Sequence, residues 1–148
     1  TSVIVAYYKG QEHLDWILNN HLYNVRAGEN KGSITLDNKL INARYLLLHN
    51  GKESHHLIRI NKEGPKIYTR AELVKMGYPQ YRISGTDQID IIREQREANK
   101  IYLVFKLFKN NSAEKELLAY KWTNLGDTRP HAENLVKLIS RAKKKVDD

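Results

Sequence analysis

Hydrophobic and polar residues follow one another along the first part of the chain in a pattern that predicts short strands and one helix. Residues 3–8 form an almost uninterrupted apolar run before Lys9-Gly10, which is typical of a buried strand. Apolar residues recur at helical spacing within residues 11–20, so we expect a short helix there. Residues 22–25 and 34–36 again have the composition of strands, and a polar loop separates them.

The centre of the chain carries the clearest hairpin signal. Residues 43–49 are predicted to form a central strand, and Asn50-Gly51 follows directly, a dipeptide that favours the tight turn of a β-hairpin. We expect residues 55–60 to form the partner strand. Because adjacent residues of a strand point to opposite faces, His55 and His56 should lie on different faces of that sheet.

A capping box marks the next helix. Thr69 and Glu72 have the spacing at which each side chain hydrogen-bonds the other residue's backbone N–H, and Gly77 with Pro79 marks the end of the helix. The pattern over residues 82–100 is ambiguous, because its isoleucines favour a strand while the charged run after them favours a helix. The assignment of that segment stays open.

Two further strands and a terminal helix are predicted in the last third of the chain. Residues 101–108 and 117–122 have strand composition, and the polar turn between them indicates an antiparallel pair. An apolar stripe at helical spacing after Pro130 predicts a C-terminal helix. The stripe consists of Leu135, Leu138, Ile139, Ala142 and Val146.

This order of elements predicts one α+β domain over residues 1–148. The strands are short and joined by short turns, which favours a mainly antiparallel sheet that curls to cover its edges. We therefore expect a small, partly open β-barrel, or pseudobarrel, with short corner helices and a C-terminal helix. Because the chain begins with Thr1-Ser2 rather than methionine, we expect it to be a domain cut from a larger protein.

The net charge narrows the class of partner. Lys and Arg number 25 against 17 Asp and Glu, which gives a formal charge of +8. This excess favours nucleic acid as a partner, although a solvated basic surface is the simpler explanation. The chain has no cysteine, so disulfides and cysteine-based zinc sites are excluded. No apolar run approaches the roughly 20 residues that span a bilayer, so we expect no membrane partner and a cytoplasmic location.

No residue pattern indicates catalysis. A nuclease of the Asp, Glu-x-Lys type needs an acid two residues before a strand lysine, and Val104 holds that position before Lys106. His55 and His56 should not share a metal ion, since neighbours in a strand diverge. The phosphate-loop and nucleophile-elbow motifs are missing from the sequence. We therefore expect no catalytic residue, no metal and no cofactor in this domain.

Two polar loops collect the side chains that read bases and bind phosphates. Each loop alone is more simply explained as a solvated connection, but together with the net charge the two loops indicate a nucleic-acid-binding surface. The candidate base-reading residues are Arg26, Asn30, Lys31, Gln80 and Arg82, the candidate phosphate contacts are Lys62, Lys66 and Arg70, and Ser33 and Tyr81 complete the two loops.

Four segments of the chain carry a resemblance to a known family. They are Asp15-Trp-Ile-Leu-Asn-Asn-His-Leu-Tyr-Asn-Val-Arg26, Arg44-Tyr-Leu-Leu-Leu48, Lys66-Ile-Tyr-Thr-Arg-Ala-Glu-Leu-Val-Lys-Met-Gly-Tyr-Pro79 and Ile101-Tyr-Leu-Val-Phe105. Their order resembles the B3-like effector domains, which recognise DNA, of prokaryotic restriction endonucleases.

The resemblance implies a pseudobarrel with two arms that grip the major groove of double-stranded DNA and read a specific site. It also implies a separate nuclease domain in the same parent protein, a type II restriction endonuclease of a restriction-modification system. Carried to this sequence, the first arm is residues 26–33, and the second is residues 62–70 or 78–84.

A PUA- or EVE-like module is the alternative. Such domains are also small barrels, and they accept a modified or flipped base of DNA or RNA in an aromatic-lined pocket. The candidate walls of such a pocket are Trp16, Tyr23, Tyr45 and Trp122, although aromatic residues at strand and helix positions belong more often to the core. RNA binding through the same basic face is a third alternative.

Overall fold

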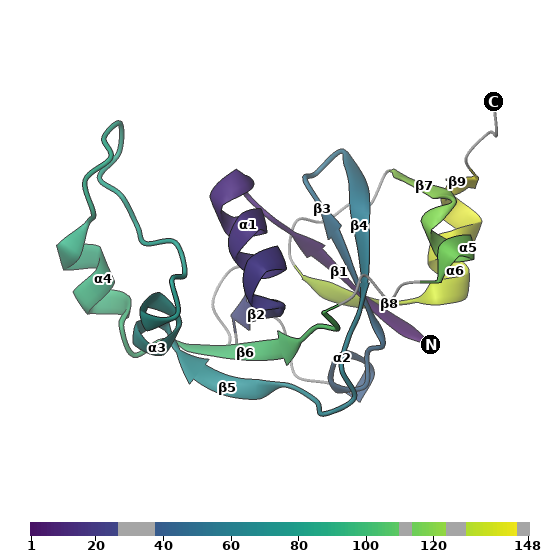
Figure 1. Cartoon of the computed structure of the whole chain (residues 1–148), viewed down its shortest axis with the longest axis horizontal. Coiled ribbons are helices and arrows are strands. Elements are labelled where there is room, and N and C mark those ends of the chain that lie inside the picture. The colour runs from purple at the N-terminus through teal and green to yellow at the C-terminus, as the bar shows by residue number, and fades with distance from the viewer. Residues whose placement is uncertain (27–37, 110–113, 124–129, 145–148) are drawn as a thin grey trace.

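Two β-sheets and several short helices make up the chain, so the predicted α+β class is confirmed (Figure 1). The computed structural model describes residues 1–26, 38–109, 114–123 and 130–144. The larger sheet has six strands in the order β8-β1-β3-β4-β7-β9, and the smaller has three in the order β2-β6-β5. Within these residues the sheets do not close into a barrel. The strand expected at residues 34–36 lies outside them.

The larger sheet is built on two strands that pair in parallel. β1 (Ser2–Tyr7) lies beside β3 (Tyr45–His49), and Val3 is opposite Tyr45. Both faces of this pair are covered, which explains the continuous apolar runs in their sequences. The predicted antiparallel arrangement holds for the other strand pairs, including β8 (His131–Asn134), a polar strand at the edge of the sheet that the sequence pattern missed.

The hairpin predicted at Asn50-Gly51 is confirmed. It joins β3 to β4 (Glu53–Arg59), and the two strands pair antiparallel. The Asn50 side-chain oxygen accepts hydrogen bonds from the backbone N–H groups of Lys52 and Glu53, at 3.0 and 3.1 Å. Gly51 has a φ of 98°, a left-handed conformation that glycine adopts without strain.

The smaller sheet covers one face of the larger sheet together with a helix. It contains β2 (Leu22–Arg26), β5 (Lys66–Thr69) and β6 (Ile101–Lys106), all antiparallel. Helix α1 (Gln11–Asn20) adds Leu14, Trp16 and Ile17 to the shared core. Side chains from both sheets meet here, so this cluster is the main core of the molecule.

A second core lies on the other face of the larger sheet. It is covered by α5 (Lys115–Leu118), β7 (Tyr120–Thr123) and α6 (Leu135–Arg141), and β9 (Lys143–Lys144) pairs with β7. The prediction of a strand over residues 117–122 is therefore wrong at its start. The predicted pairing of that strand with residues 101–108 is also wrong, since β7 pairs with β4 and β9.

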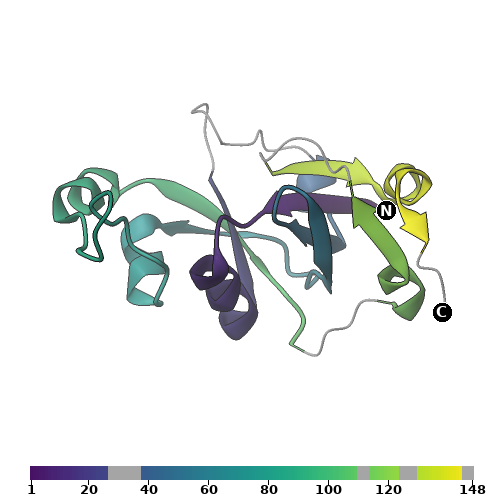
Figure 2. The same cartoon turned by 90° about the horizontal axis from the view of Figure 1, so that it is seen from above.

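Helices α3 (Arg70–Lys75) and α4 (Ile91–Glu97) lie at one end of the molecule, away from the six-stranded sheet (Figures 1 and 2). The capping box of Thr69 and Glu72 is present as predicted. The ambiguous segment contains α4, whose first turn is capped by the Asp90 side chain. Two short helices, α2 (Asn38–Ile41) and α5, were not predicted. Of the helices in the described ranges, none is long and apolar enough to cross a membrane.

Candidate functional site

The region around α3 and α4 contains Arg70, whose polar groups already have partners. Arg70 is 3% exposed. Its Nε donates to Glu94 Oε2 at 3.0 Å, and its Nη2 donates to Glu94 Oε1 at 2.8 Å. The same guanidinium also donates to the hydroxyl of Tyr102 and the carbonyl oxygen of Pro79. Arg70 therefore joins α3, α4 and β6, and we do not include it in the proposed binding surface.

Both members of the pair, Arg70 and Glu94, are charged. Burial alone would raise the pKa of the Glu94 carboxyl, but hydrogen bonds from Arg70 and from the Tyr81 N–H outweigh it and lower that pKa. Burial alone would lower the pKa of Arg70, and its bonds to Glu94 and Tyr102 raise it. The result is a bidentate ion pair between a buried Arg70 and a half-buried Glu94, the kind of arginine–carboxylate contact with the most defined geometry.

Two other predicted residues of this region, Tyr81 and Arg82, also have partners inside the protein. The ring centroid of Tyr81 lies 3.9 Å from Cζ of Arg70 and 3.8 Å from Cζ of Arg93, so no face of the ring is left for a base. Burial raises the pKa of Tyr81 to about 12, which keeps its hydroxyl neutral. Arg82 pairs with Glu12 at 3.3 Å and donates to the carbonyl oxygen of Asp87. Gln80 is half-buried.

Lys62 and Lys66 differ from this group because they are exposed and have no ion-pair partner among the residues the structure describes. Arg26 is the last residue of β2. Three further members of the predicted set, Asn30, Lys31 and Ser33, lie outside the described residues. The predicted residues near α4 therefore make contacts inside the protein, whereas Lys62 and Lys66 are exposed and have no ion pair in the described residues.

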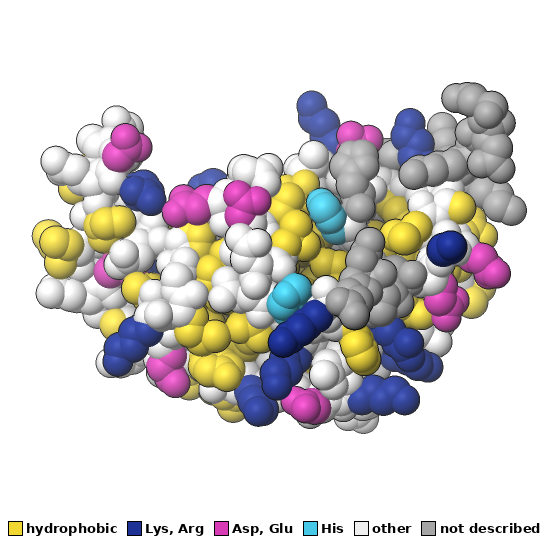
Figure 3. Space-filling view, viewed as in Figure 1, with side chains coloured by type: hydrophobic (Ala, Val, Ile, Leu, Met, Phe, Trp, Pro, Cys, Tyr) yellow, Lys and Arg dark blue, Asp and Glu magenta, His cyan; other side chains and the backbone are white. Residues whose placement is uncertain are grey.

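A hollow lies along the outer edge of β4, and we call it the central pocket. In the described residues β4 pairs with β7 at Glu53 and Ser54 alone. Toward its other end β4 meets the chain that follows β6, where the Phe108 N–H donates to the Arg59 carbonyl at 3.0 Å. Between these two contacts the strand edge borders a pocket of about 660 Å³. In the view of Figure 3, hydrophobic and histidine side chains gather in the middle of the molecule.

The walls of the central pocket come from both cores. Ile58 and Leu107 belong to the main core, and Leu57 belongs to the second core on the other face of the sheet. Aromatic rings line it as well: Phe108, Tyr120 and Trp122. The rings of Tyr120 and Trp122 are 5.7 Å apart, because residues two apart in a strand share a face.

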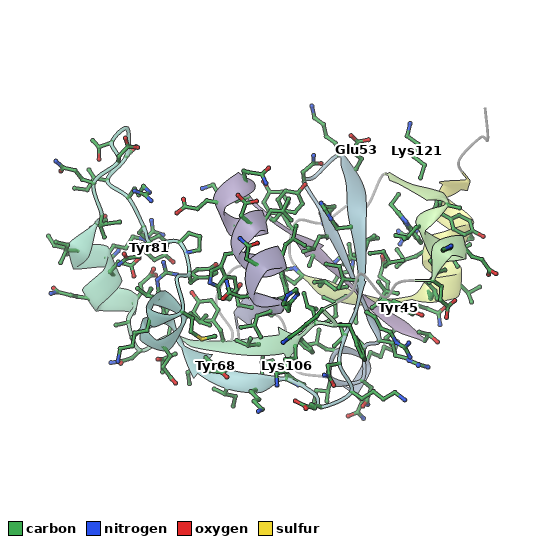
Figure 4. The ribbon with its side chains drawn as sticks, in the orientation of Figure 1. Tyr45, Glu53, Tyr68, Tyr81, Lys106 and Lys121 are labelled. Atoms are coloured by element: carbon green, nitrogen blue, oxygen red, sulfur yellow. The ribbon has the colours of Figure 1, made fainter. Side chains whose placement is uncertain are left out.

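Polar groups surround these apolar walls. His21, His56 and Ser54 line the pocket, and the Ser54 hydroxyl donates to the carbonyl oxygen of Leu48. Two exposed lysines, Lys109 and Lys121, also line it and have no ion-pair partner within the described part of the chain. Figure 4 shows Lys121 and Glu53 at the same end of β7 and β4.

Trp122 contributes one further polar group. The side chain is buried, and its indole N–H has no hydrogen-bond acceptor among the residues described here. A buried donor without a partner costs about 1 to 3 kcal/mol, so a ligand that accepts a hydrogen bond from this N–H would remove that cost. The central pocket therefore combines aromatic surface, hydrogen-bonding groups and free positive charge, which suits a flat polar ring that carries an anionic group.

The sequence analysis named one residue that lines this pocket, Trp122, and missed the others. All four aromatic residues considered as pocket walls are buried in the two cores, and of these Trp122 also lines the central pocket, whereas Trp16, Tyr23 and Tyr45 do not. The hydroxyl of Tyr23 and the indole N–H of Trp16 donate to the backbone carbonyls of Tyr7 and Met76. The sequence analysis did not use one signal that marks this pocket, Phe108, an aromatic residue directly after a strand and next to Lys109.

The described residues contain no group of three His, Asp or Glu side chains placed to hold a metal ion. Comparisons of the chain with protein-family models, curated proteins and solved structures gave no significant match. The function is therefore argued from the geometry of the central pocket and its surroundings.

Proposed function

We propose that this chain binds DNA and that the central pocket takes up one unstacked base. The observation that carries the proposal is the lining of the pocket, where Phe108, Tyr120 and Trp122 lie beside Lys109 and Lys121. A base stacked on an aromatic side chain gains about 1 to 3 kcal/mol, and lysines beside it neutralise the phosphates of the same strand.

The size and chemistry of the pocket support this assignment. Its volume of about 660 Å³ lies within the range of pockets that bind small organic ligands. His21, which lines the pocket, offers a ring nitrogen donor and acceptor for the polar edge of a base. The net charge of +8 favours an anionic partner over a neutral small molecule. A modified base fits the same argument, since proteins recognise extruded bases by edge contacts and stacking.

Sequence-specific recognition of double-stranded DNA, as in a B3-like effector domain, is the second candidate. Lys62 and Lys66 support it, because both are exposed and without an ion-pair partner in the described ranges. In this candidate the two sheets act as an open pseudobarrel, and the chain is the target-recognition domain of a prokaryotic, cytoplasmic restriction endonuclease. The nuclease domain of the parent protein would be its partner within the same chain.

The base-pocket proposal is tested with two duplexes of the same sequence, one fully paired and one with a single unpaired base. We expect tighter binding to the duplex with the unpaired base, because extrusion of a paired base costs a few kcal/mol. Tyr120→Ala should weaken that binding by about 1 to 3 kcal/mol. Fluorescence anisotropy at fixed salt measures both effects.

Tyr68→Ala is the matched control, since Tyr68 is a half-buried tyrosine of β5 that does not line the pocket. Equal affinity for both duplexes would overturn the proposal, as would an equal loss in the two tyrosine variants. Selection from random duplexes separates the second candidate, which requires one preferred sequence and no preference for an unpaired base.

A further inference from the structure

A smaller hollow at the end of the β3–β4 hairpin opposite the Asn50-Gly51 turn has an unusual charge, and we call it the cationic cleft. It has a volume of about 310 Å³. Its polar side chains are those of Arg44, Arg59, Lys62, Asn42 and Asn61. No acidic side chain of the described residues lines it. Three positive charges around one small hollow repel one another unless an anion lies between them.

The backbone holds these cations in place. The Ile60 N–H donates to the carbonyl of Arg44, the residue before β3, at 2.7 Å, which holds Arg44 beside the end of β4 that carries Arg59. Asn61 fixes the turn that carries Lys62, because its N–H donates to the Lys106 carbonyl and its side chain accepts from the Glu63 N–H. Asn61 also keeps Glu63 in a turn where that carboxylate pairs with Lys106 at 3.4 Å.

The three cations have no carboxylate partner in the described part of the chain. Lys62 and Arg44 are exposed, and the guanidinium of Arg59 lies over the ring of Phe108, with Cζ 5.4 Å from the ring centroid. A guanidinium held over an aromatic ring keeps its donors free at the edges of its plane. The cleft thus offers three cationic side chains that have no carboxylate partner in the described residues.

Arg59 and Phe108 also connect the cleft with the central pocket. Phe108 lines the central pocket and Arg59 lines the cationic cleft, so the stacked pair forms the boundary between the two. In a nucleic acid strand every base is attached to a sugar that carries phosphates on either side. A strand whose base enters the pocket therefore brings a phosphate close to this boundary.

We infer that the cationic cleft binds a phosphodiester group of the strand whose base enters the central pocket, with Arg44, Arg59 and Lys62 as its ligands. This inference rests on the proposed function. Arginine binds phosphate through paired N–H donors, whereas lysine binds it as a point charge, so the two arginines orient the phosphate and Lys62 adds attraction. The cleft fixes the position of the backbone and leaves the reading of the base to the pocket.

The test is the salt dependence of binding to the duplex with one unpaired base. Arg44→Gln and Lys62→Gln should each weaken binding and reduce the slope of log K against log salt by about 1, with the preference for the unpaired base unchanged. Arg44→Lys should retain part of the lost affinity. Lys137→Gln, on the exposed surface of α6, is the matched control and should leave affinity and slope within error. Equal slopes in the cleft variants and the control would overturn the inference.

Titration with inorganic phosphate separates failure of this inference from failure of the proposed function. We expect the backbone amide signals of Asn61 and Lys62 to shift in NMR spectra of the wild type and not of the Arg44→Gln variant. Phosphate binding at these amides without any binding of the unpaired-base duplex would refute the proposed function and keep an anion site. Duplex binding with no phosphate response and no change of slope would refute the cleft alone.

Discussion

The α3–α4 region and the central pocket contain the same kinds of side chain, tyrosine beside arginine or lysine. The two regions differ in how far these side chains are buried and paired. Near α4, Arg70 is buried against Glu94, and Tyr81 lies between two guanidinium groups. Along the pocket, Lys121 is exposed without a carboxylate partner in the described ranges, and Tyr120 is half-buried at a hollow. Positive charge near α4 is paired with a carboxylate and contributes to stability, whereas Lys121, although Glu53 lines the same pocket, has no ion pair in the described residues and is available for binding.

The largest expected effect comes from breaking the buried ion pair. Glu94→Gln should reduce the free energy of unfolding by about 3 to 5 kcal/mol, because it leaves the Arg70 guanidinium buried without its counter-charge. Urea unfolding monitored by circular dichroism measures this loss.

Glu12→Gln is the control for that experiment. Glu12 pairs with Arg82 at 3.3 Å on the surface, where the two side chains are 62% and 41% exposed. Such pairs contribute at most about 1 kcal/mol. A similar loss in both variants would contradict the division between a structural region and a binding region.

The pH dependence of the same pair is the second prediction. The pKa of Glu94 in the folded protein is lowered below its ordinary value of 4.5, because its bonds to Arg70 and Tyr81 outweigh burial. Its stabilising effect is therefore complete above pH 4.5 and is lost as the pH falls through the folded pKa. The difference in unfolding free energy between wild type and Glu94→Gln should shrink below pH 4.5. A difference that stays constant between pH 7 and pH 3 would show that the carboxylate charge is unimportant.

Local sequence signals predicted the elements that depend on neighbouring residues. The turn at Asn50-Gly51, the capping box of Thr69 and Glu72, and the helix over residues 11–20 all follow from contacts within a few positions. The strand partners did not follow, because pairing depends on residues far apart in the chain. The parallel pairing of β1 with β3 and the pairing of β7 with β4 have no local signature.

The candidate site was harder to predict for the same reason. Sequence reasoning grouped Arg70 with exposed phosphate contacts, and its partner Glu94 lies in a segment whose structure the pattern left open. The central pocket exists because β4 meets β7 at one end and the chain after β6 at the other. Trp122 was named as a pocket wall from its type, but its neighbours in the pocket follow only from this arrangement of strands.

The smallest effect on stability and the sharpest test of the comparison come from Lys121. Lys121→Gln should change the free energy of unfolding by less than about 0.5 kcal/mol, because the side chain is exposed and has no ion-pair partner in the described residues. The same variant should weaken DNA binding and reduce the slope of log K against log salt by about 1. Arg93→Gln, near Tyr81, should do the reverse and lower stability with little effect on the slope. If Lys121→Gln destabilised the fold and left binding unchanged, the cations along the pocket would be structural like those near α4.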